Sequence, residues 1–242
     1  MKKTIVITGA SRGIGKAIAI ELAGKDTNIV INCVNNVDKL NEVRSIIEEK
    51  GSVCETFIGD MGNYSDVQKM FDMCLQRFGQ VDVLINNAGI SVVGLFQDMG
   101  ENEWHRICNT NIDSVFNCCH FAVKDMMKRH RGKIINISSV WGLYGASCEV
   151  AYSATKGAVN SFTKALAKEL APSGIQVNAV ACGAIDTEMN GHLSDDDKAS
   201  LAEEIPAGRF GSPQEVAKLV KSLSGMNSYL TGQIITLDGG WI

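Results

Sequence analysis

Short apolar runs alternate along this chain with longer segments whose apolar residues recur every three or four positions. Residues 4–8, 28–34, 53–58, 81–85 and 175–181 form such runs, and a further apolar run begins at residue 234. Continuous β-branched runs are typical of strands buried on both faces of a parallel sheet. The intervening segments, such as residues 39–50 and 66–78, have the apolar spacing of amphipathic helices. With one more strand ending at Ser139, the pattern predicts an α/β, Rossmann-type doubly wound seven-stranded parallel sheet with helices on both faces.

Polar residues or glycines lie at or just past the ends of four predicted strands. They are Gly9, Asp60, Asn87 and Ser139. The carboxyl ends of parallel strands lie at one edge of such a sheet, and ligands bind there. We therefore expect these four residues to share one edge. No linker, repeat or change of composition divides the sequence, so residues 1–242 are expected to form a single domain.

A glycine-rich turn joins the first strand to the first helix. Its sequence is Gly9-Ala-Ser11-Arg12-Gly13-Ile14-Gly15. A strand, a glycine turn and a helix together present backbone N–H groups and a helix N-terminus to a diphosphate. The glycine spacing is GxxxGxG instead of the better-known GxGxxG, so a plain glycine-rich turn is the alternative.

The end of the second strand bears on the choice of nucleotide. An acidic residue there would bind a ribose 2′-hydroxyl, whereas a cation would accept a 2′-phosphate. The sequence has Asn35 and Asn36 at this place, with no acid before Asp38, and Arg12 stands in the glycine turn. This combination favours NADP(H), although Arg12 could also be a simple exposed loop charge.

Tyr152 and Lys156 are four residues apart in a predicted helix, so they lie on one face. A nearby ammonium should lower the tyrosine pKa from about 10 by about 1–3 units, which would make it a proton donor or acceptor near neutral pH. The spacing is short and common, so an ordinary exposed helix face is the alternative. Ser139 precedes Tyr152 by thirteen residues. Its neighbour Ser138 should point to the opposite face of the strand.

Composition excludes several classes of protein. A net charge of −4 without a basic stripe argues against nucleic-acid binding, and residues 128–131 are most simply a cationic helix end. No apolar run is long enough to span a membrane, and the N-terminal one is too short for a signal peptide. Eight cysteines without a CxxC pair, and four unpaired histidines, predict reduced thiols in a cytoplasmic protein and no metal site.

Taken together, the motifs resemble the short-chain dehydrogenase/reductase family. They are Thr8–Gly15, Asn86–Gly89, Asn111, Ser139, Tyr152-x-x-x-Lys156 and Asp238–Gly240, and they span nearly the whole chain. Residues 205–211 and 229–240 are similar to the 3-oxoacyl-[acyl-carrier-protein] reductase group. Residues 139–150 are similar to a narrower branch that reduces a 5-aminopentanone group on elongation factor P.

The resemblance implies an oxidoreductase acting on a CH–OH or C=O group. Tyr152 would protonate the carbonyl oxygen and Ser139 would hold that oxygen, while Lys156 would lower the tyrosine pKa and bind the nicotinamide ribose. Asn111 would hold a water that connects Lys156 to solvent; its alternative is a mid-helix asparagine satisfied locally. The implied cofactor contacts are Gly9, Ser11, Arg12, Gly13, Ile14, Gly15, Asn35, Asp60, Met61, Asn87, Ala88, Gly89, Tyr152, Lys156, Gly183, Ile185 and Thr187.

Two of these contacts have structural alternatives. Asp60 could contact the adenine or cap the next segment, and Asn87 could be a turn residue. Cys182 stands where the family usually has proline, which leaves the rigidity of that loop in doubt. A redox-active thiol there has no cation nearby in the sequence to support it.

The family also implies an internal organisation. Residues 1–90 would form the nucleotide half and residues 91–242 the catalytic and substrate part, with a lid at about residues 186–208. In the lid, the acids Asp195–Asp197 suit the N-terminus of a short helix. A homotetramer would use the helices that start near Trp104 and Tyr152, and the last strand.

Three functions agree with these residues. The leading one is reduction of a 3-oxoacyl thioester on acyl carrier protein, with Lys128, Arg129 and Arg131 as candidate docking residues. The second is reduction of the 5-aminopentanone group on elongation factor P, because Glu149, close to Tyr152, suits a cationic amine. The third is an NADP-binding regulator without catalytic activity, against which the complete set of four catalytic residues argues.

Overall fold

A parallel sheet forms the centre of the computed structural model, which describes residues 2–191, 193–225 and 229–242. Within these residues seven strands pair in the order β3-β2-β1-β4-β5-β6-β7, all parallel. The strands are β1 (Lys3–Ile7), β2 (Thr27–Cys33), β3 (Val53–Ile58), β4 (Val83–Asn86), β5 (Gly132–Ser139), β6 (Ile175–Cys182) and β7 (Ile234–Leu237). The predicted seven-stranded, doubly wound sheet is confirmed, and β7 lies at one edge of it.

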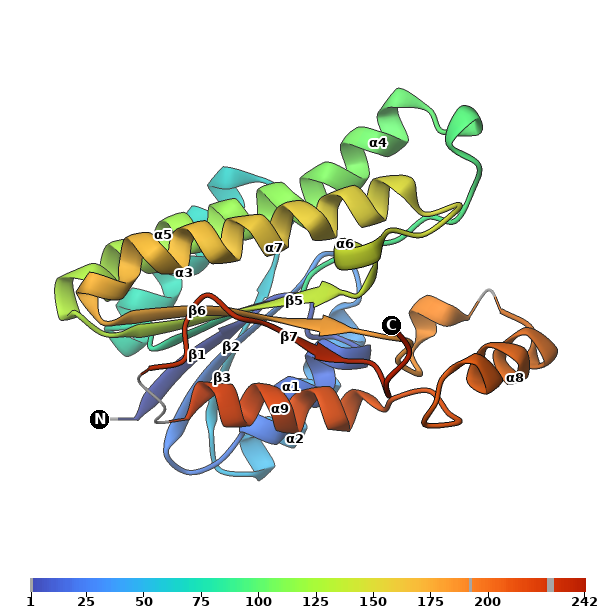
Figure 1. Cartoon of the computed structure of the whole chain (residues 1–242). Helices are drawn as coiled ribbons and strands as arrows, with labels where there is room; N and C mark the ends of the chain where they lie inside the picture. The colour runs from blue at the N-terminus through green and yellow to red at the C-terminus, as the bar shows by residue number, and fades with distance from the viewer. Residues whose placement is uncertain (1, 192, 226–228) are drawn as a thin grey trace.

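Helices cover both faces of this sheet, as Figure 1 shows. The α-helices are α1 (Gly13–Leu22), α2 (Val37–Glu49), α3 (Tyr64–Phe78), α4 (Glu101–Cys108), α5 (Ser114–Arg129), α6 (Trp141–Tyr144), α7 (Val150–Leu170), α8 (Asp195–Glu204) and α9 (Pro213–Ser224). Shorter helical turns are η1 (Phe96–Asp98), η2 (Asn109–Asp113), η3 (Ala171–Ser173) and η4 (Glu188–Asn190), of which η2 is a π-helix. Among the described residues, no helix is both long and apolar enough to cross a membrane.

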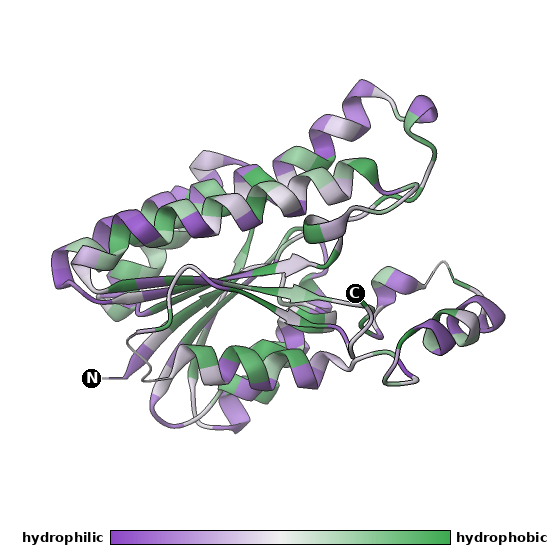
Figure 2. Ribbon diagram, viewed as in Figure 1, coloured by the Kyte–Doolittle hydropathy of each residue, from purple (hydrophilic) through white to green (hydrophobic). Residues whose placement is uncertain are grey.

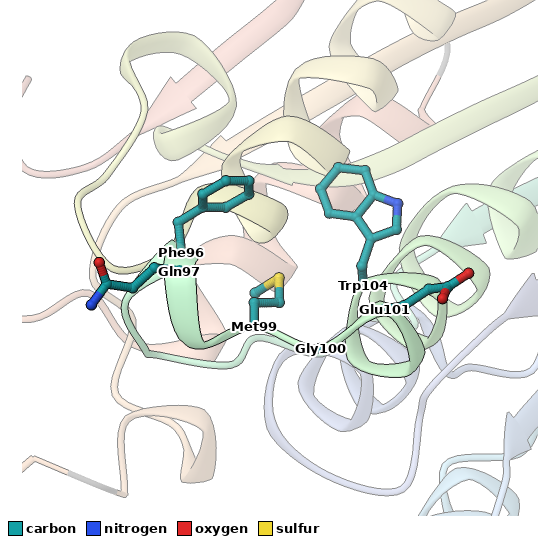
Figure 3. Close-up of a pocket in the computed structure, with 6 residues that line it drawn as sticks. All are labelled: Phe96, Gln97, Met99, Gly100, Glu101 and Trp104. Carbon is teal, nitrogen blue, oxygen red and sulfur yellow. The ribbon is translucent and has the colours of Figure 1, made fainter.

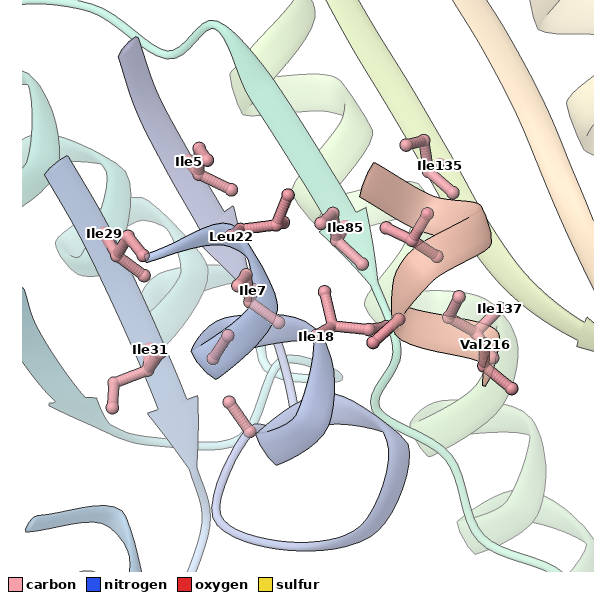
Figure 4. Close-up of a cluster of buried hydrophobic side chains, with 14 of the residues drawn as sticks. Ile5, Ile7, Ile18, Leu22, Ile29, Ile31, Ile85, Ile135, Ile137 and Val216 are labelled. Atoms are coloured by element: carbon pink, nitrogen blue, oxygen red, sulfur yellow. The ribbon is translucent and has the colours of Figure 1, made fainter. Parts of the chain in front are cut away.

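The alternation of side chains along the strands divides the core into two clusters. In β1, Ile5 and Ile7 face one side, where they pack with α1, α2 and α9, and Val6 faces the other side, which packs with α3, α5 and α7. Figure 4 shows the first cluster, with Ile18 of α1 among the strand isoleucines. Figure 2 shows that the central strands are mostly hydrophobic, whereas the helices are hydrophobic mainly where they face the sheet. Burial on both faces explains why the strands lack polar alternation.

The carboxyl ends of the strands lie at one edge of the sheet. In Figure 1 the arrowheads of β5, β6 and β7 point toward the side where α6 and α8 lie. The residues Gly9, Asp60, Asn87 and Ser139 follow or close β1, β3, β4 and β5, and therefore share this edge as predicted. The candidate site is built here.

Helix boundaries differ slightly from those that the sequence indicated. Helix α7 begins at Val150, two residues before Tyr152, so Tyr152 and Lys156 both belong to its first two turns. The predicted short helix in the lid is α8, and its start is fixed by a capping box between Ser194 and Asp197. The three acids at this start are the solvated helix N-terminus that the sequence predicted.

Candidate active site

The glycine turn between β1 and α1 lies directly against the segment that follows β4. Gly9 and Gly13 have positive φ angles of 62° and 54°, which favour glycine. A Cβ atom on Gly9 would lie 2.9 Å from the Cα of Ala88, and one on Gly15 would lie 2.4 Å from Nδ2 of Asn87. Glycine is therefore required at Gly9 and Gly15 by the close approach of two backbone segments.

Hydrogen bonds hold these two segments together. The side-chain amide of Asn87 donates to the carbonyl oxygens of Thr8, at 3.0 Å, and Gly9, at 2.9 Å. In return, Oγ1 of Thr8 accepts from the backbone N–H groups of Asn87 and Ala88, each at 3.0 Å. Asn87 is thus more than a turn residue, because its side chain fixes the shape of the glycine turn.

The beginning of α1 has the form of an anion site. Arg12 is the N-cap residue of this helix, but its guanidinium extends to Glu188 at 2.8 Å instead of folding back over the helix end. No described side chain caps this helix end, so the N–H groups of the first turn stay available to an anion, and a diphosphate binds at this place in such folds. Ser11 is buried within this turn, and Ile14 packs partly against the core. The turn fits a nucleotide cofactor.

A second cation, which the sequence analysis missed, lies beside Arg12. Lys39 in the first turn of α2 binds Glu188 at 3.0 Å, so this one carboxylate joins Arg12 and Lys39. Asn35, two residues past the end of β2, is exposed. The position of Lys39 in the first turn of the helix after β2 was the sequence signal that could have indicated this second cation.

The segment after β3 agrees less well with its predicted role. Both carboxylate oxygens of Asp60 have partners, since one accepts from the N–H of Gly62 at 2.9 Å and the other from Asn109 at 3.2 Å. The cap of the next helix, α3, is Asn63 and not Asp60. Met61 is only 2% exposed and its side chain belongs to the core, while its carbonyl oxygen accepts a hydrogen bond from Asn117 at 3.0 Å.

Ser139 and Tyr152 meet at the end of β5. Their side chains form a hydrogen bond, and Oγ of Ser139 also accepts from the N–H of Trp141 at 3.2 Å. Ser138 points the other way and donates to Oδ1 of Asn160 at 2.6 Å. The structure thus brings Ser139, and not Ser138, to the tyrosine, because neighbouring strand residues face opposite sides.

Lys156 lies beside Tyr152, but its effect on the tyrosine differs from the one we predicted. Its ammonium donates to the carbonyl of Ile137 at 2.8 Å and lies 5.5 Å from the centroid of the Tyr152 ring. Burial raises the pKa of Tyr152 well above its usual value, and the hydrogen bond with Ser139 opposes this only partly. The expected lowering of this pKa by Lys156 is therefore wrong for this structure, because desolvation outweighs any effect of the cation. Burial also lowers the pKa of Lys156 to about 8.

Asn111 sits in the π-helical turn η2 between α4 and α5. Its amide accepts from the N–H of Ile90 and donates to the carbonyl of Ile90, both at 2.9 Å, and donates to Oγ1 of Thr155 at 3.0 Å. A Cβ on Gly89 would lie 3.4 Å from Oδ1 of Asn111 and 3.5 Å from Nζ of Lys156. Asn111 and Lys156 therefore both lie against Gly89. Asn111 sits in a π turn within a continuous helical stretch, a feature frequent at functional sites, and its side-chain partners come from other segments.

Cys182 ends β6 opposite Ser139 and is 5% exposed. Burial raises the pKa of its thiol to about 12, and the nearby Lys156 opposes this only weakly. The tertiary structure thus supplies the cation that the sequence did not place near Cys182, yet the thiol stays protonated near neutral pH. A reactive thiolate is not favoured here.

The residues after Cys182 return toward the glycine turn. Gly183 leaves room for Asp238, whose Cα would lie 2.7 Å from an added Cβ. Ile185 is buried and pairs with Gly211. Thr187 lies close to Gly13. A Cβ atom added to Gly13 would lie 3.6 Å from the methyl group of Thr187. The predicted lid therefore starts directly over the glycine turn.

A carboxylate, that of Glu149, lies near Tyr152. Glu149 accepts a hydrogen bond from Ser91 at 2.5 Å, and its charge helps to raise the pKa of Tyr152. Trp141 contacts Trp241 edge-on, with ring centroids 4.9 Å apart. Ser91 and Trp241 were not predicted, since no local pattern connects them to Tyr152.

A surface hollow of about 430 Å³ lies apart from these residues (Figure 3). Its lining comes from η1, the start of α4 and the residues between them, and includes none of the predicted site residues. The lining residues are Phe96, Gln97, Met99, Gly100, Glu101 and Trp104.

The proposed docking role of Arg129 is contradicted by its contacts. Its guanidinium binds Asp82 at 3.0 Å and Asp125 at 2.8 Å, and only 24% of the side chain is exposed. Arg129 ends α5 next to the start of β5, so it lies at the amino edge of the sheet, opposite the site. In the described part of the chain, no group of three or more His, Cys, Asp or Glu residues could hold a metal ion.

Known proteins resemble this chain over nearly its whole length. It is 40% identical over 241 residues to the 3-oxoacyl-[acyl-carrier-protein] reductase FabG of Staphylococcus epidermidis, with 99% of each chain covered. It is 37% identical to the FabG of Chlamydia trachomatis, covering 99% of this chain and 97% of the relative. The solved structure titled "ElxO with NADP Bound" has a TM-score of 0.91 and 33% identity, covering 100% of this chain and 99% of the other.

The family model for short chain dehydrogenases matches residues 3–198, which include the glycine turn and the residues around Tyr152. This range and the full-length relatives confirm the resemblance that the motifs indicated. The chain is a member of the short-chain dehydrogenase family.

Proposed function

We propose that this chain is an NADPH-dependent reductase that transfers hydride to the ketone of a 3-oxoacyl thioester on acyl carrier protein and forms a 3-hydroxyacyl product. The observation that carries the proposal is the meeting of Ser139, Tyr152 and Lys156 at the carboxyl edge of the sheet, where Lys156 also lies near Gly89. The full-length relatives, which are named as reductases of this substrate, support it.

Residues at the carboxyl edge would hold NADPH, which supplies the hydride when bound. The first turn of α1 would take the diphosphate, and Arg12 with Lys39 would take the 2′-phosphate. The backbone of residues 60–61 and 87–89 would line the adenosine side. Gly183, Ile185 and Thr187 would lie along the nicotinamide. The NADP-bound relative of known structure supports this choice of nucleotide.

Tyr152 would give its proton to the carbonyl oxygen as negative charge develops there. Its raised pKa keeps the phenol protonated across the neutral range, which suits an acid. Ser139 would donate a hydrogen bond to the same oxygen. Lys156 would contact the nicotinamide ribose, and with Asn111 it would pass a proton from solvent back to Tyr152. The π turn at Asn111 would hold the water of this relay.

The test is the oxidation of NADPH by the purified protein with an acetoacetyl thioester on acyl carrier protein. We expect turnover that depends on the ketone and is far faster with NADPH than with NADH. Tight NADPH binding without turnover of any ketone would favour the regulator without activity, and a strong preference for NADH would contradict the nucleotide assignment.

Glu149 favours a second substrate. A half-buried carboxylate beside Tyr152, held by Ser91, would attract an ammonium group, and the 5-aminopentanone group on elongation factor P carries one. The same assay with modified elongation factor P separates the two substrates. A Glu149→Gln variant should raise KM for the amino ketone and leave KM for the acetoacetyl thioester unchanged.

We propose that the chain is organised around this site. Residues 1–90 form the nucleotide half and residues 91–242 the catalytic and substrate part, while residues 186–208 act as a lid over the substrate. The protein would work in the cytoplasm as a homotetramer, built through α4, α5 and α7 and a second contact at β7. Exposed apolar side chains on α4 and α5, such as Trp104 and Phe116, support the first of these contacts.

A further inference from the structure

One carboxylate of the lid holds both cations that line the end of β2. Oε2 of Glu188 binds Arg12 at 2.8 Å, and Oε1 binds Lys39 at 3.0 Å. The three side chains come from three elements, namely η4, the N-cap of α1 and the first turn of α2. Each cation has its own oxygen of the same carboxylate, which is how two cations share an oxyanion.

The position of this cluster is set by the strand order. β1 and β2 are neighbours in the sheet, so Arg12 follows the end of one and Lys39 the end of the next. In dinucleotide-binding folds, the group at the end of the second strand meets the ribose 2′ position, and a cation there accepts a 2′-phosphate. Glu188 therefore places a negative charge where the 2′-phosphate of NADPH would lie.

The lid reaches this position through its own contacts. Thr187, the residue before Glu188, lies against Gly13 of the glycine turn. The three charged side chains are about half exposed, at 56% for Arg12, 49% for Lys39 and 51% for Glu188. Such exposed pairs are weak and reversible, so an incoming dianion with the same partners can replace the carboxylate.

We propose that Glu188 is a specificity-determining residue that competes with the 2′-phosphate of the nucleotide for Arg12 and Lys39. This inference rests on the proposed use of NADPH. Binding of a 2′-phosphorylated nucleotide releases Glu188 and with it the start of the lid, whereas a nucleotide without this phosphate leaves the ion pairs in place. Glu188 thus weakens binding of the preferred cofactor. It also makes release of the start of the lid depend on binding of that cofactor.

The competition predicts an effect that depends on the phosphate. Loss of the carboxylate in Glu188→Gln should tighten binding of 2′-phosphorylated nucleotides, because binding no longer breaks the ion pairs of Glu188 with Arg12 and Lys39. Two exposed ion pairs correspond to about a threefold to tenfold change in Kd. Binding of nucleotides without the phosphate should not change.

The experiment measures Kd by calorimetry for adenosine 2′,5′-bisphosphate and for 5′-AMP, neither of which contains nicotinamide. The full chain is compared with Glu188→Gln and with Glu203→Gln, an exposed residue of the lid helix α8 that undergoes the same change of charge. We expect only Glu188→Gln to bind the bisphosphate more tightly, with no change for 5′-AMP.

Other outcomes separate this inference from the function on which it rests. If Glu188→Gln changes the Kd of both nucleotides equally, or matches Glu203→Gln, then Glu188 is a surface ion pair and the competition is refuted. If the unaltered protein binds the bisphosphate no better than 5′-AMP, the proposed preference for NADPH is refuted, and the competition by Glu188 is refuted with it. Lys39→Gln should weaken binding of the bisphosphate alone, and an unchanged Kd would remove Lys39 from the phosphate site.

Discussion

At the residue scale, the chemistry of the site depends on how burial changes two neighbouring groups. Tyr152 and Lys156 are four residues apart, and both lose water in the folded chain. Desolvation disfavours the charged form of each group, so it raises the pKa of the phenol and lowers that of the ammonium. The tyrosine is thereby kept as an acid instead of a phenolate.

Replacing Tyr152 by phenylalanine should remove the proton donor and leave the nucleotide site intact. We expect kcat for ketone reduction to fall by about a hundredfold to ten-thousandfold, the usual contribution of a general acid. Kd for NADPH should change much less than kcat, because Tyr152 is only one of the many implied cofactor contacts. Normal turnover by Tyr152→Phe would show that another group supplies the proton.

The pH dependence of reduction should reflect Lys156. Its pKa of about 8 means that the ammonium is charged below pH 8 and neutral above it, while Tyr152 stays protonated throughout this range. We therefore expect kcat/KM to fall as the pH rises past about 8, since this parameter reports groups of the free enzyme. Lys156→Arg keeps its charge at high pH. It should lower the rate but abolish the fall of kcat/KM at high pH. If kcat/KM of this variant still falls at high pH, the titration of another group must cause the fall.

At the scale of elements, the glycine turn and the segment that follows β4 form one unit. Asn87 closes the turn with two hydrogen bonds, and Gly9 and Gly15 let the segments approach. The sequence predicted the turn from its glycine spacing and its place between a strand and a helix. It could not show that Asn87 is a partner of the turn, because the two segments are more than seventy residues apart in the sequence.

Gly15→Ala should damage this unit. The new methyl group would lie 2.4 Å from both Nδ2 of Asn87 and the carbonyl oxygen of Gly9, so one of them must move. We expect a loss of about 1–3 kcal/mol in the free energy of unfolding, as for other overpacked sites, together with weaker NADPH binding. The control is Gly24→Ala, where an added Cβ meets no described atom within 4 Å. Equal effects of the two variants would contradict the close approach.

The end of α5 has a structural role at the opposite edge of the sheet. Arg129 joins this helix to the segment before β4 through Asp125 and Asp82. The sequence showed a run of cations at a helix end and no more, because Asp82 lies on a distant segment, although Asp125 stands four residues earlier in α5. Docking of a carrier protein therefore cannot rest on Arg129.

Arg129→Met should lower stability without changing catalysis. Removal of the cation leaves the buried carboxylate of Asp82 without its ion pair, and we expect a loss of about 2–3 kcal/mol, below the ~3–5 kcal/mol of fully buried pairs. Urea denaturation measures it. Lys128→Met, at the exposed neighbouring position, should change the free energy of unfolding by less than about 0.5 kcal/mol. A fall in kcat without a loss of stability in Arg129→Met would point to a role near the site.

At the scale of the whole molecule, apolar surface remains on the helices α4 and α5 after folding. Trp104 is 37% exposed and Phe116 is 49% exposed. Exposed aromatic side chains of this kind on neighbouring helices are typical of surfaces between subunits. This surface agrees with the proposed homotetramer.

Phe116→Asp should weaken that contact, since it places a charge in an apolar interface. We expect sedimentation velocity to show dimers or monomers in place of tetramers. Val37→Asp, which adds the same charge to an exposed position of α2 on the other face of the sheet, should leave the assembly unchanged. A sedimentation coefficient that Phe116→Asp does not alter would exclude this surface from the assembly.

The sequence by itself determined the strand and helix alternation, the parallel sheet, the glycine turn and the edge where Ser139 and Tyr152 meet. These features follow from local periodicity and from the rule that parallel strands end together. Only the tertiary structure decided the direction of the pKa of Tyr152, the core position of Met61 and the sharing of Glu188 by Arg12 and Lys39. Desolvation and contacts between distant segments depend on the packed chain, and no local pattern records them.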